Sequence, residues 1–404
     1  LRRELLADTL TYYAQFSQLV ADNGFLSEDL ATTQYKSGLL AERLGDLQTA
    51  ARHYRDAAKA WDDTPDDDRA VAAEALARAA LGRVEFELGR PDEASAQLRQ
   101  AIVVQRQLLA DTPEEPTYLA ALGDSLGRLG LQRRRQGDLA GAIAALQEAT
   151  TLNRRAYELA PDDRQRLHTL AAACNSLGET LRSSDSEAAL GNCLQAQQWM
   201  QQLHDAFPDD DSLAADLAMT INNVAAMKAA SGKWQAAVDG YRAAAAHVES
   251  LVRRHPRIPR HRRELAVCRS NLGLALARIG DSLGSDEAFA AAQEALEDLS
   301  SDFPDQTSYL AGLAVLWNNR GVAYRTTDRM DEAVAAFAEA VARQEALIAC
   351  DGATPAQAET LRTQYENYVS ALQLMGNQSA AEAAQRHCDE LLSSLAAAQN
   401  PVIP

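Results

Sequence analysis

Aromatic residues, paired cysteines and long apolar runs are all scarce in this sequence. Aromatic side chains are 5% of its 404 residues, and with so much alanine and leucine this composition indicates packed helices rather than sheets. The five cysteines lie far apart and form no CxxC pair, which argues against a disulfide framework or a zinc site. We expect them to be small buried side chains. No stretch approaches the roughly 20 apolar residues that span a bilayer.

Basic residues are also fewer than acidic ones. Lys plus Arg number 39 against 57 Asp plus Glu, which leaves a formal net charge of −18, and a chain of this sign repels nucleic acid. The lack of an N-terminal secretory signal and the unpaired cysteines favour a cytoplasmic location. A membrane segment in a longer parent chain would change that expectation.

The motifs of familiar enzymes are absent or out of place. Seven histidines are scattered without a metal-binding pair, and no kinase catalytic loop, Asp-Phe-Gly or phosphate loop occurs. Residues 123–127 and 280–284 both read Gly-Asp-Ser-Leu-Gly. The first lies in an expected helix and the second on an expected helix turn, whereas the serine of a hydrolase follows a strand. We therefore predict no catalytic residue, no metal and no cofactor.

The chain repeats itself at intervals of about 48 residues. Prolines at a fixed place in the repeat are separated by 48, 47, 48 and 48 residues: Pro113, Pro161, Pro208, Pro256 and Pro304. A second series, mostly glycine, keeps this interval at most steps: Gly45, Gly89, Gly137, Ser184, Gly232, Gly280, Asp328 and Gly376. A fixed period of this length indicates stacked supersecondary units.

Each repeat is interpreted as a helical hairpin. The glycine ends helix A in the left-handed conformation that the turn requires, and residues such as Pro91 and Asp92 suit the first turn of helix B. Helix B has small residues five and twelve positions after the glycine, as at Ala94 and Ala101, which share one helical face. A small residue inside helix A, such as Gly130, lets the two helices approach closely.

These features together resemble the pattern of the tetratricopeptide repeat, and residues 271–280 and 318–333 match it well. The resemblance implies an all-α, right-handed superhelical solenoid of about eight antiparallel hairpins. It also implies that the A helices line the concave side and bind a partner. The period exceeds the usual value of about 34, and in this the repeats are similar to those attached to planctomycete-type bacterial serine/threonine protein kinases.

The repeats divide the chain into three parts. Residues 1–25 predict a lone B-type helix, which is half a repeat and needs something to cover its apolar face. Residues 26–398 predict the array of hairpins, and residues 399–404 a tail. The uncovered first helix favours a fragment of a larger signalling protein that continues upstream. The alternative is an architectural scaffold, in which this helix joins copies of the chain into a homo-oligomer.

An asparagine recurs in helix A every 48 residues. The series is Asn175, Asn223, Asn271, Asn319 and Asn367. Asparagine offers both a donor and an acceptor, so a row of them can hold the main chain of an extended peptide. In the tetratricopeptide family, asparagine two residues before the small helix-A position recurrently binds peptide, and Asn223, Asn271 and Asn319 match that place. The alternative is that these amides bond neighbouring A helices to each other and order the stack.

Arginines four residues after the small position of helix A are expected on the same groove. They are Arg134, Arg182 and Arg325. A guanidinium fork binds carboxylate or phosphate, so we predict a peptide or protein partner with acidic or carboxylate groups. The alternative is that these arginines pair with acids nearby. A cluster of arginines and histidines within 253–263 is either a solvated loop or a contact for an acidic partner, a phosphate or an anionic membrane surface. The runs of acidic residues that follow the prolines are interpreted as helix caps.

Overall fold

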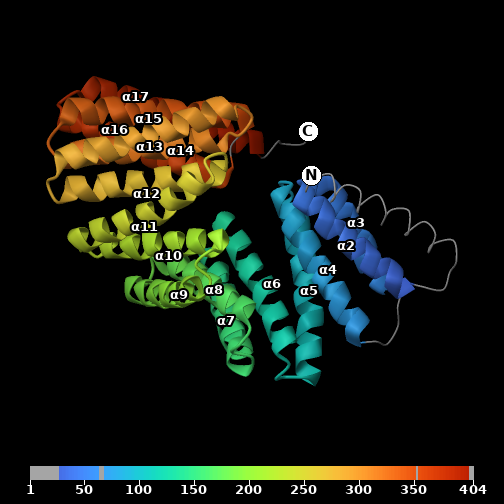
Figure 1. Cartoon of the computed structure of the whole chain (residues 1–404). Helices are drawn as coiled ribbons and strands as arrows, with labels where there is room; N and C mark the ends of the chain where they lie inside the picture. The colour runs from blue at the N-terminus through green and yellow to red at the C-terminus, as the bar shows by residue number, and fades with distance from the viewer. Residues whose placement is uncertain (1–26, 63–67, 352–353, 400–404) are drawn as a thin grey trace. The chain divides into compact units, whose positions relative to one another are not determined.

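All elements in the described part of the chain are α-helices. The computed structural model describes residues 27–62, 68–351 and 354–399, and no strand occurs among them. Figure 1 shows the helices following one another along the chain, joined by short turns. For these residues the prediction of an all-α solenoid of antiparallel hairpins is confirmed. The half repeat expected in residues 1–25 lies outside the described residues, as does the tail beyond residue 399.

The chain divides into two compact units, of which the first is Leu1–Thr180. Its A and B helices alternate and pack in sequence, α2 with α3, α4 with α5, and α6 with α7. The bounds are α2 (Ser27–Leu44), α3 (Leu47–Asp62), α4 (Asp68–Glu87), α5 (Pro91–Asp111), α6 (Pro116–Arg135), α7 (Leu139–Leu159) and α8 (Arg164–Leu181). In this unit α2, α4, α6 and α8 are the A helices.

The second unit, Leu181–Pro404, continues the same alternation. Its A helices α10, α12, α14 and α16 each pack along the B helix that follows, and α10, α12 and α14 each also contact the next A helix. The bounds are α9 (Ser186–Ala206), α10 (Asp211–Ala230), α11 (Trp234–Arg254), α12 (Pro259–Arg278), α13 (Ser282–Asp302), α14 (Ser308–Thr326), α15 (Met330–Asp351), α16 (Pro355–Leu374) and α17 (Gln378–Gln399). Within this unit, helices adjacent in the sequence are therefore also neighbours in space.

The turns between A and B helices use the left-handed conformation that the glycine series predicts. Six glycines of that series have φ between 73° and 86°, a region that residues with a Cβ rarely adopt. Asp328 takes the same conformation with φ of 60°, as the one non-glycine residue with positive φ in the described chain. Ser184 does not have positive φ; there the Asp185 N–H donates to the Leu181 carbonyl over 2.8 Å.

Close contact between the two helices of a hairpin rests on the small residues that the sequence analysis singled out. A Cβ on Gly321 would lie 2.7 Å from the ring of Phe337, and one on Gly273 would lie 2.8 Å from the ring of Phe289. The alanines of helix B are buried completely at nearly every repeat, as Ala333 illustrates. Phe289 also packs with side chains of α12 and α14, so the core continues from one hairpin to the next.

The connections between hairpins contain the prolines and acids of the repeat. Asp163 accepts hydrogen bonds from the backbone N–H groups of Gln165 and Arg166, and Asp210 caps α10 in the same way, so these acids are helix caps as predicted. The expectation of buried cysteines holds for four of the five. It is wrong for Cys350, which is exposed because it lies in the last turn of α15, where the core ends.

None of the described helices is both long and apolar enough to cross a membrane.

Candidate partner-binding face

The predicted asparagine series forms a hydrogen-bonded ladder across the A helices of the second unit. The Asn271 side chain in α12 donates to Asn222 Oδ1 in α10 over 3.2 Å. One repeat further, Asn319 in α14 donates to Ser270 Oγ over 3.3 Å, and Asn367 in α16 donates to Asn318 Oδ1 over 3.0 Å. Each bond joins residues 49 positions apart. The ladder therefore orders the stack, as the alternative interpretation of these amides held.

The ladder residues remain partly accessible while they make these bonds. Asn271, Asn319 and Asn367 are partly exposed, as is Asn223 at the equivalent position of α10. An asparagine has capacity for further bonds beyond the one donor that Asn271, Asn319 and Asn367 each use here. Asn175, in the first unit, differs, because it is buried and donates to Glu179 Oε1 over 3.3 Å within its own helix.

An exposed apolar stripe runs beside the ladder. Met219, Val267 and Val315 lie on α10, α12 and α14 at the same place in the repeat, and their exposed fractions are 45%, 47% and 47%. Each precedes a ladder asparagine by four residues, so the two side chains are one helical turn apart on a single face. The name A-face is used here for the surface that these three side chains share with Asn223, Asn271, Asn319 and Asn367.

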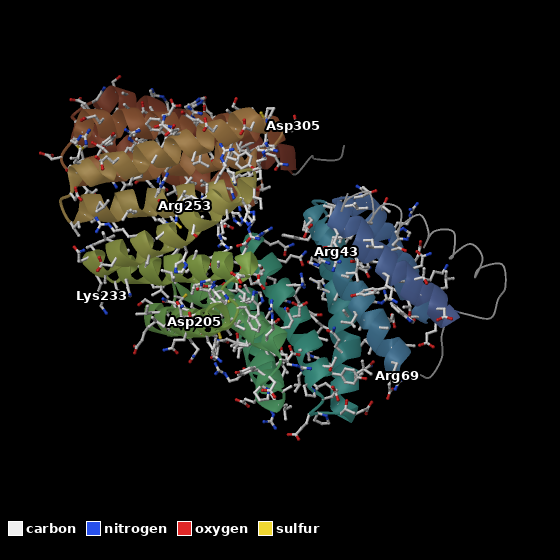
Figure 2. The ribbon with its side chains drawn as sticks, viewed as in Figure 1. Arg43, Arg69, Asp205, Lys233, Arg253 and Asp305 are labelled. Atoms are coloured by element: carbon white, nitrogen blue, oxygen red, sulfur yellow. The ribbon has the colours of Figure 1, made fainter. Side chains whose placement is uncertain are left out.

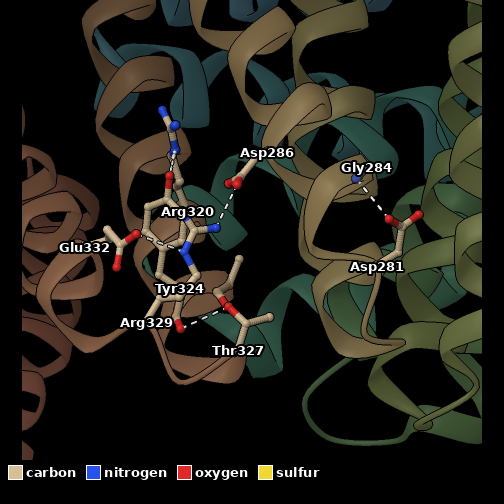
Figure 3. A network of polar contacts seen from close by, with 9 residues as sticks. Asp281, Gly284, Asp286, Arg320, Tyr324, Thr327, Arg329 and Glu332 are labelled. Carbon is tan, nitrogen blue, oxygen red and sulfur yellow. Dashed lines mark hydrogen bonds and ion pairs between the residues drawn. The ribbon is translucent and has the colours of Figure 1, made fainter.

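The opposite side of α14 is held by a polar network (Figure 3). Arg320 donates to the Tyr324 hydroxyl over 2.7 Å, and Arg329 pairs with Asp286 at 2.7 Å and with Glu332 at 3.0 Å. Tyr324 is five residues after Asn319, so it lies about 140° further around the helix. Arg320 also donates to Gln293 of α13 over 2.9 Å, so the network joins α14 and the turn after it to α13 and α15.

The three predicted arginines occupy three different environments. Arg134 forms an ion pair with Glu179 at 2.9 Å, so it is paired with a nearby acid. Arg182 is exposed and lies just beyond the end of α8. Arg325 stacks over the Phe337 ring at 5.5 Å and donates weakly to Asn367 Oδ1 over 3.5 Å, which places it at the ladder. Two of the predicted arginines thus lie near a predicted asparagine: Arg325 contacts Asn367, and Arg134 shares the Glu179 carboxylate with Asn175.

The basic segment around residues 253–263 is largely neutralised by nearby acids. Arg254 and His255 both pair with Asp211, and Arg262 pairs with Asp302 at 3.0 Å. Among the residues that the structure describes, the exposed arginines of the segment without an acidic partner are Arg253, Arg257 and Arg263. Arg253 is labelled in Figure 2. Only residues 255–258 form the connection between the hairpins, whereas the rest of the segment is the end of α11 and the start of α12.

No reactive group accompanies the A-face. Burial raises the pKa of the Cys268 thiol, next to Val267 in sequence, to about 12, so this thiol stays protonated and unreactive at neutral pH. Within residues 27–62, 68–351 and 354–399, no cluster of three or more His, Cys, Asp or Glu side chains could hold a metal ion. The chemistry that the A-face offers is hydrogen bonding and apolar contact.

Comparison with protein families agrees with the hairpin geometry. Tetratricopeptide repeat profiles match residues 29–107, 79–164 and 314–346. The chain contains tetratricopeptide repeats. These matches cover hairpins in both units, and the tetratricopeptide pattern predicted from glycine and alanine spacing is thereby confirmed. No curated protein is significantly similar to the chain in sequence.

Solved structures of low sequence identity share the fold. The apo form of the quorum sensor NprR from B. thuringiensis is 11% identical, covers 97% of each chain and has a TM-score of 0.60. The apo form of RapI is 10% identical over 78% of this chain and 97% of its own, with a TM-score of 0.55. A Rap protein complexed with Competence and Sporulation Factor is 12% identical over 97% and 99%, with a TM-score of 0.52. At these low identities, the similarities support the tetratricopeptide fold alone.

The apolar stripe was missed by the sequence analysis, although its signal is present. Met219, Val267 and Val315 are separated by 48 residues and each stands four positions before a ladder asparagine. Two residue types at the same period and one helical turn apart indicate a shared face. What the spacing could not show is that these apolar side chains are exposed, because the exposure depends on the crossing of neighbouring hairpins.

Proposed function

We propose that this chain is a non-catalytic interaction or sensor module that binds an extended peptide, or an extended segment of a protein partner, across the A-face. The observation that carries the proposal is the row of partly exposed asparagines set beside an exposed apolar stripe on successive A helices. The amides suit the main chain of a peptide, and the stripe suits its apolar side chains.

The ladder bonds contribute to binding by holding the amides in place. An asparagine fixed by a bond to the next A helix loses less rotamer freedom when a ligand binds than a freely rotating side chain would. The two interpretations of the asparagine series are therefore compatible. The same Asn271 or Asn319 side chain orders the stack with one N–H and offers its remaining capacity to a partner.

The spacing of the A helices matches an extended chain. Packed helices lie about 8–10 Å apart, and an extended peptide rises about 3.3 Å per residue. About three peptide residues therefore cross each step of the ladder, and a regularly spaced group of the peptide meets an equivalent asparagine in each hairpin. A partner with apolar side chains at such intervals fits the stripe of Met219, Val267 and Val315.

Two of the similar solved structures give this proposal context. NprR is described as a quorum sensor, and the Rap protein was solved in complex with Competence and Sporulation Factor. We further propose that Arg325 binds an acidic or carboxylate group of the partner, because it lies at the ladder and faces no acid among the described residues.

Attachment to a bacterial serine/threonine kinase remains a prediction about the parent protein.

The test is a selection of random phage-displayed peptides on the immobilised chain, followed by fluorescence polarisation with the enriched peptides. We expect peptides with spaced apolar residues to be enriched. The double substitution Asn271→Ala with Asn319→Ala should weaken their binding by about tenfold or more, because it removes two hydrogen-bonding amides. Val267→Asp should weaken it as well, since it places a charge in the apolar stripe.

The matched control is Gln235→Ala, which removes an exposed amide from the B helix α11. This variant should bind with unchanged affinity. Thermal melting of every variant separates loss of the ladder from loss of the fold. If no peptide is enriched, or if the asparagine variant melts normally and binds as well as the unaltered chain, the A-face is not the binding surface.

A further inference from the structure

The A-face repeats at a fixed interval, and this interval limits which peptide conformation can use it. Neighbouring A helices of the second unit contact each other, α10 with α12 and α12 with α14, and packed helices lie about 8–10 Å apart. The ladder bonds of Asn271 and Asn319, of 3.2 and 3.3 Å, join successive A helices at this packing distance. Equivalent groups of the A-face therefore recur about every 8–10 Å.

The apolar stripe offers three equivalent contacts in a row. Met219, Val267 and Val315 have exposed fractions of 45%, 47% and 47%. On α16 the same place in the repeat is occupied by Thr363, whose hydroxyl donates to the Glu359 carbonyl over 3.1 Å. The stripe therefore ends at α14, and a ligand meets it at three positions that are separated by two helix-to-helix steps.

A peptide in the conformation of a β-strand cannot match this interval with one face. Its side chains alternate between two faces, so residues on the same face recur about 6.6 Å apart at every second residue, or about 13 Å apart at every fourth. A residue three positions further along lies about 10 Å away, but it points to the opposite face. A strand therefore reaches neighbouring stripe residues only with side chains that point in opposite directions.

An α-helical ligand matches the interval but not the asparagines. Residues seven positions apart lie near one face of an α-helix and are about 10.5 Å apart, which suits the stripe. The main-chain N–H and C=O groups of a helix, however, bond to each other. They offer nothing to the partly exposed amides of Asn271 and Asn319, and covering these amides without new hydrogen bonds is costly.

We propose that the A-face binds a peptide in the polyproline II conformation that has an apolar residue at every third position. This inference rests on the proposed function and names the class of peptide that the site takes. A polyproline II helix has three residues per turn and rises about 3.1 Å per residue, so one of its faces recurs about every 9.3 Å. Residues i, i+3 and i+6 of the peptide then each contact one of Met219, Val267 and Val315.

The main chain of such a peptide also suits the ladder. A polyproline II helix makes no internal hydrogen bonds, so its carbonyls can accept from an asparagine amide. Asn271 and Asn319 each use one donor in the ladder, and a side-chain amide has two. Proline between the apolar residues removes N–H groups that would need partners and holds φ near about −65°. A proline-rich segment is therefore close to its bound conformation before it binds.

Four fluorescein-labelled peptides test this inference by polarisation with the whole chain. The first has seven residues, with leucine at the first, fourth and seventh positions and proline between them. The second has the same composition with leucine at the first, third and fifth positions, and the third has glycine in place of each proline of the first. The fourth is a helical peptide of alanine, glutamate and lysine with leucine at every seventh position.

We expect the first peptide to bind at least about tenfold more tightly than each of the others. The second loses the interval, the third loses the preorganised conformation, and the fourth cannot bond to the asparagines. Absence of binding by the first peptide, or binding by any other peptide that is as tight, would overturn the inference.

Double-mutant cycles then measure the spacing of the contacts. Each leucine of the tightest-binding peptide is replaced by alanine and tested against Val267→Ala and Val315→Ala. Each chain variant should weaken the unmodified peptide about threefold or more and should couple to one leucine. The two coupled leucines should be three residues apart. The matched control is Val103→Ala, an exposed valine of the B helix α5, which should leave the affinity unchanged.

The outcomes separate this inference from the proposed function. Coupled leucines at any spacing other than three would contradict the polyproline II conformation and leave the A-face as the binding surface. Phage-enriched peptides that bind Val267→Asp and the double asparagine variant as well as the unaltered chain would contradict the A-face itself, and this inference with it.

Discussion

The side-chain amide of Asn367 donates to the side-chain carbonyl of Asn318 over 3.0 Å and so joins α16 to α14. We expect Asn318→Ala and Asn367→Ala each to cost roughly 1 kcal/mol of unfolding free energy. Because each variant removes the same bond, the double variant should cost about 0.5–1 kcal/mol less than the sum. Urea unfolding of the four proteins measures this coupling. A control cycle of Asn318 with Asn222, which lies two hairpins away, should be additive to within about 0.5 kcal/mol.

The contact between Gly321 and Phe337 predicts that the helix-A glycines cannot be replaced even by alanine. Gly321→Ala would place a Cβ 2.7 Å from the Phe337 ring, and the overpacking should cost about 1–3 kcal/mol. Gly191→Ala is the matched control, because Gly191 is also inside a helix but its added Cβ would meet nothing within 4 Å. It should stabilise the chain by up to about 1 kcal/mol. Shifts of the same sign in thermal melting would contradict this explanation.

The turn at Asp328 predicts a stabilising substitution. Asp328 has φ of 60° where six other turns have glycine, and the left-handed conformation costs a residue with a Cβ about 1–2 kcal/mol. Asp328→Gly should therefore raise the unfolding free energy by up to about 1 kcal/mol, with part of the gain offset by the greater entropy of glycine in the unfolded chain. The reverse change, Gly280→Asp, should destabilise. A lower midpoint in urea for Asp328→Gly would show that the aspartate side chain stabilises the turn.

Buried thiols predict a loss of stability at alkaline pH. Burial raises the pKa of Cys268 from 9.0 to about 12 and that of Cys174 to about 11. A group whose pKa is raised in the folded state stabilises fully below its unfolded pKa, and this stability is lost as pH rises from there towards the folded value. The urea midpoint should therefore fall once the pH exceeds about 9.0.

The substitution Cys268→Ala should make that fall shallower. Cys350→Ala is its control, because Cys350 is exposed and should leave the pH dependence unchanged. Alkylation of the native chain offers a second measurement, in which Cys350 reacts first and the buried thiols only after unfolding. Rapid labelling of Cys268 in the folded chain would contradict the burial on which this prediction depends.

Much of the fold could be predicted because its signals are local. The positive φ at Gly45 or Gly280, and the cap at Asp210, depend on a few neighbouring residues. The buried faces at Ala94 and Ala101 follow from the helical period alone. Ser184 shows the limit of this reasoning, because it occupies a glycine position and yet its turn closes without positive φ.

The candidate site was predictable in its residues but not in its bonding. The 48-residue spacing marked Asn271 and Asn319, whereas their partners Asn222 and Ser270 lie 49 positions earlier. That offset depends on how one A helix is rotated and shifted against the next. Arg134 and Arg325 looked equivalent by spacing, and the neighbouring side chains gave one an acid and the other an aromatic ring.

The sequence by itself determined that this protein is a series of helical hairpins, where each turns, and which small residues face inward, because helical period and turn conformation act over a few residues. The tertiary structure alone decided which asparagines bond to which, and that Met219, Val267 and Val315 are exposed. These facts depend on contacts between residues far apart in the chain, whose geometry is set when neighbouring hairpins pack against each other.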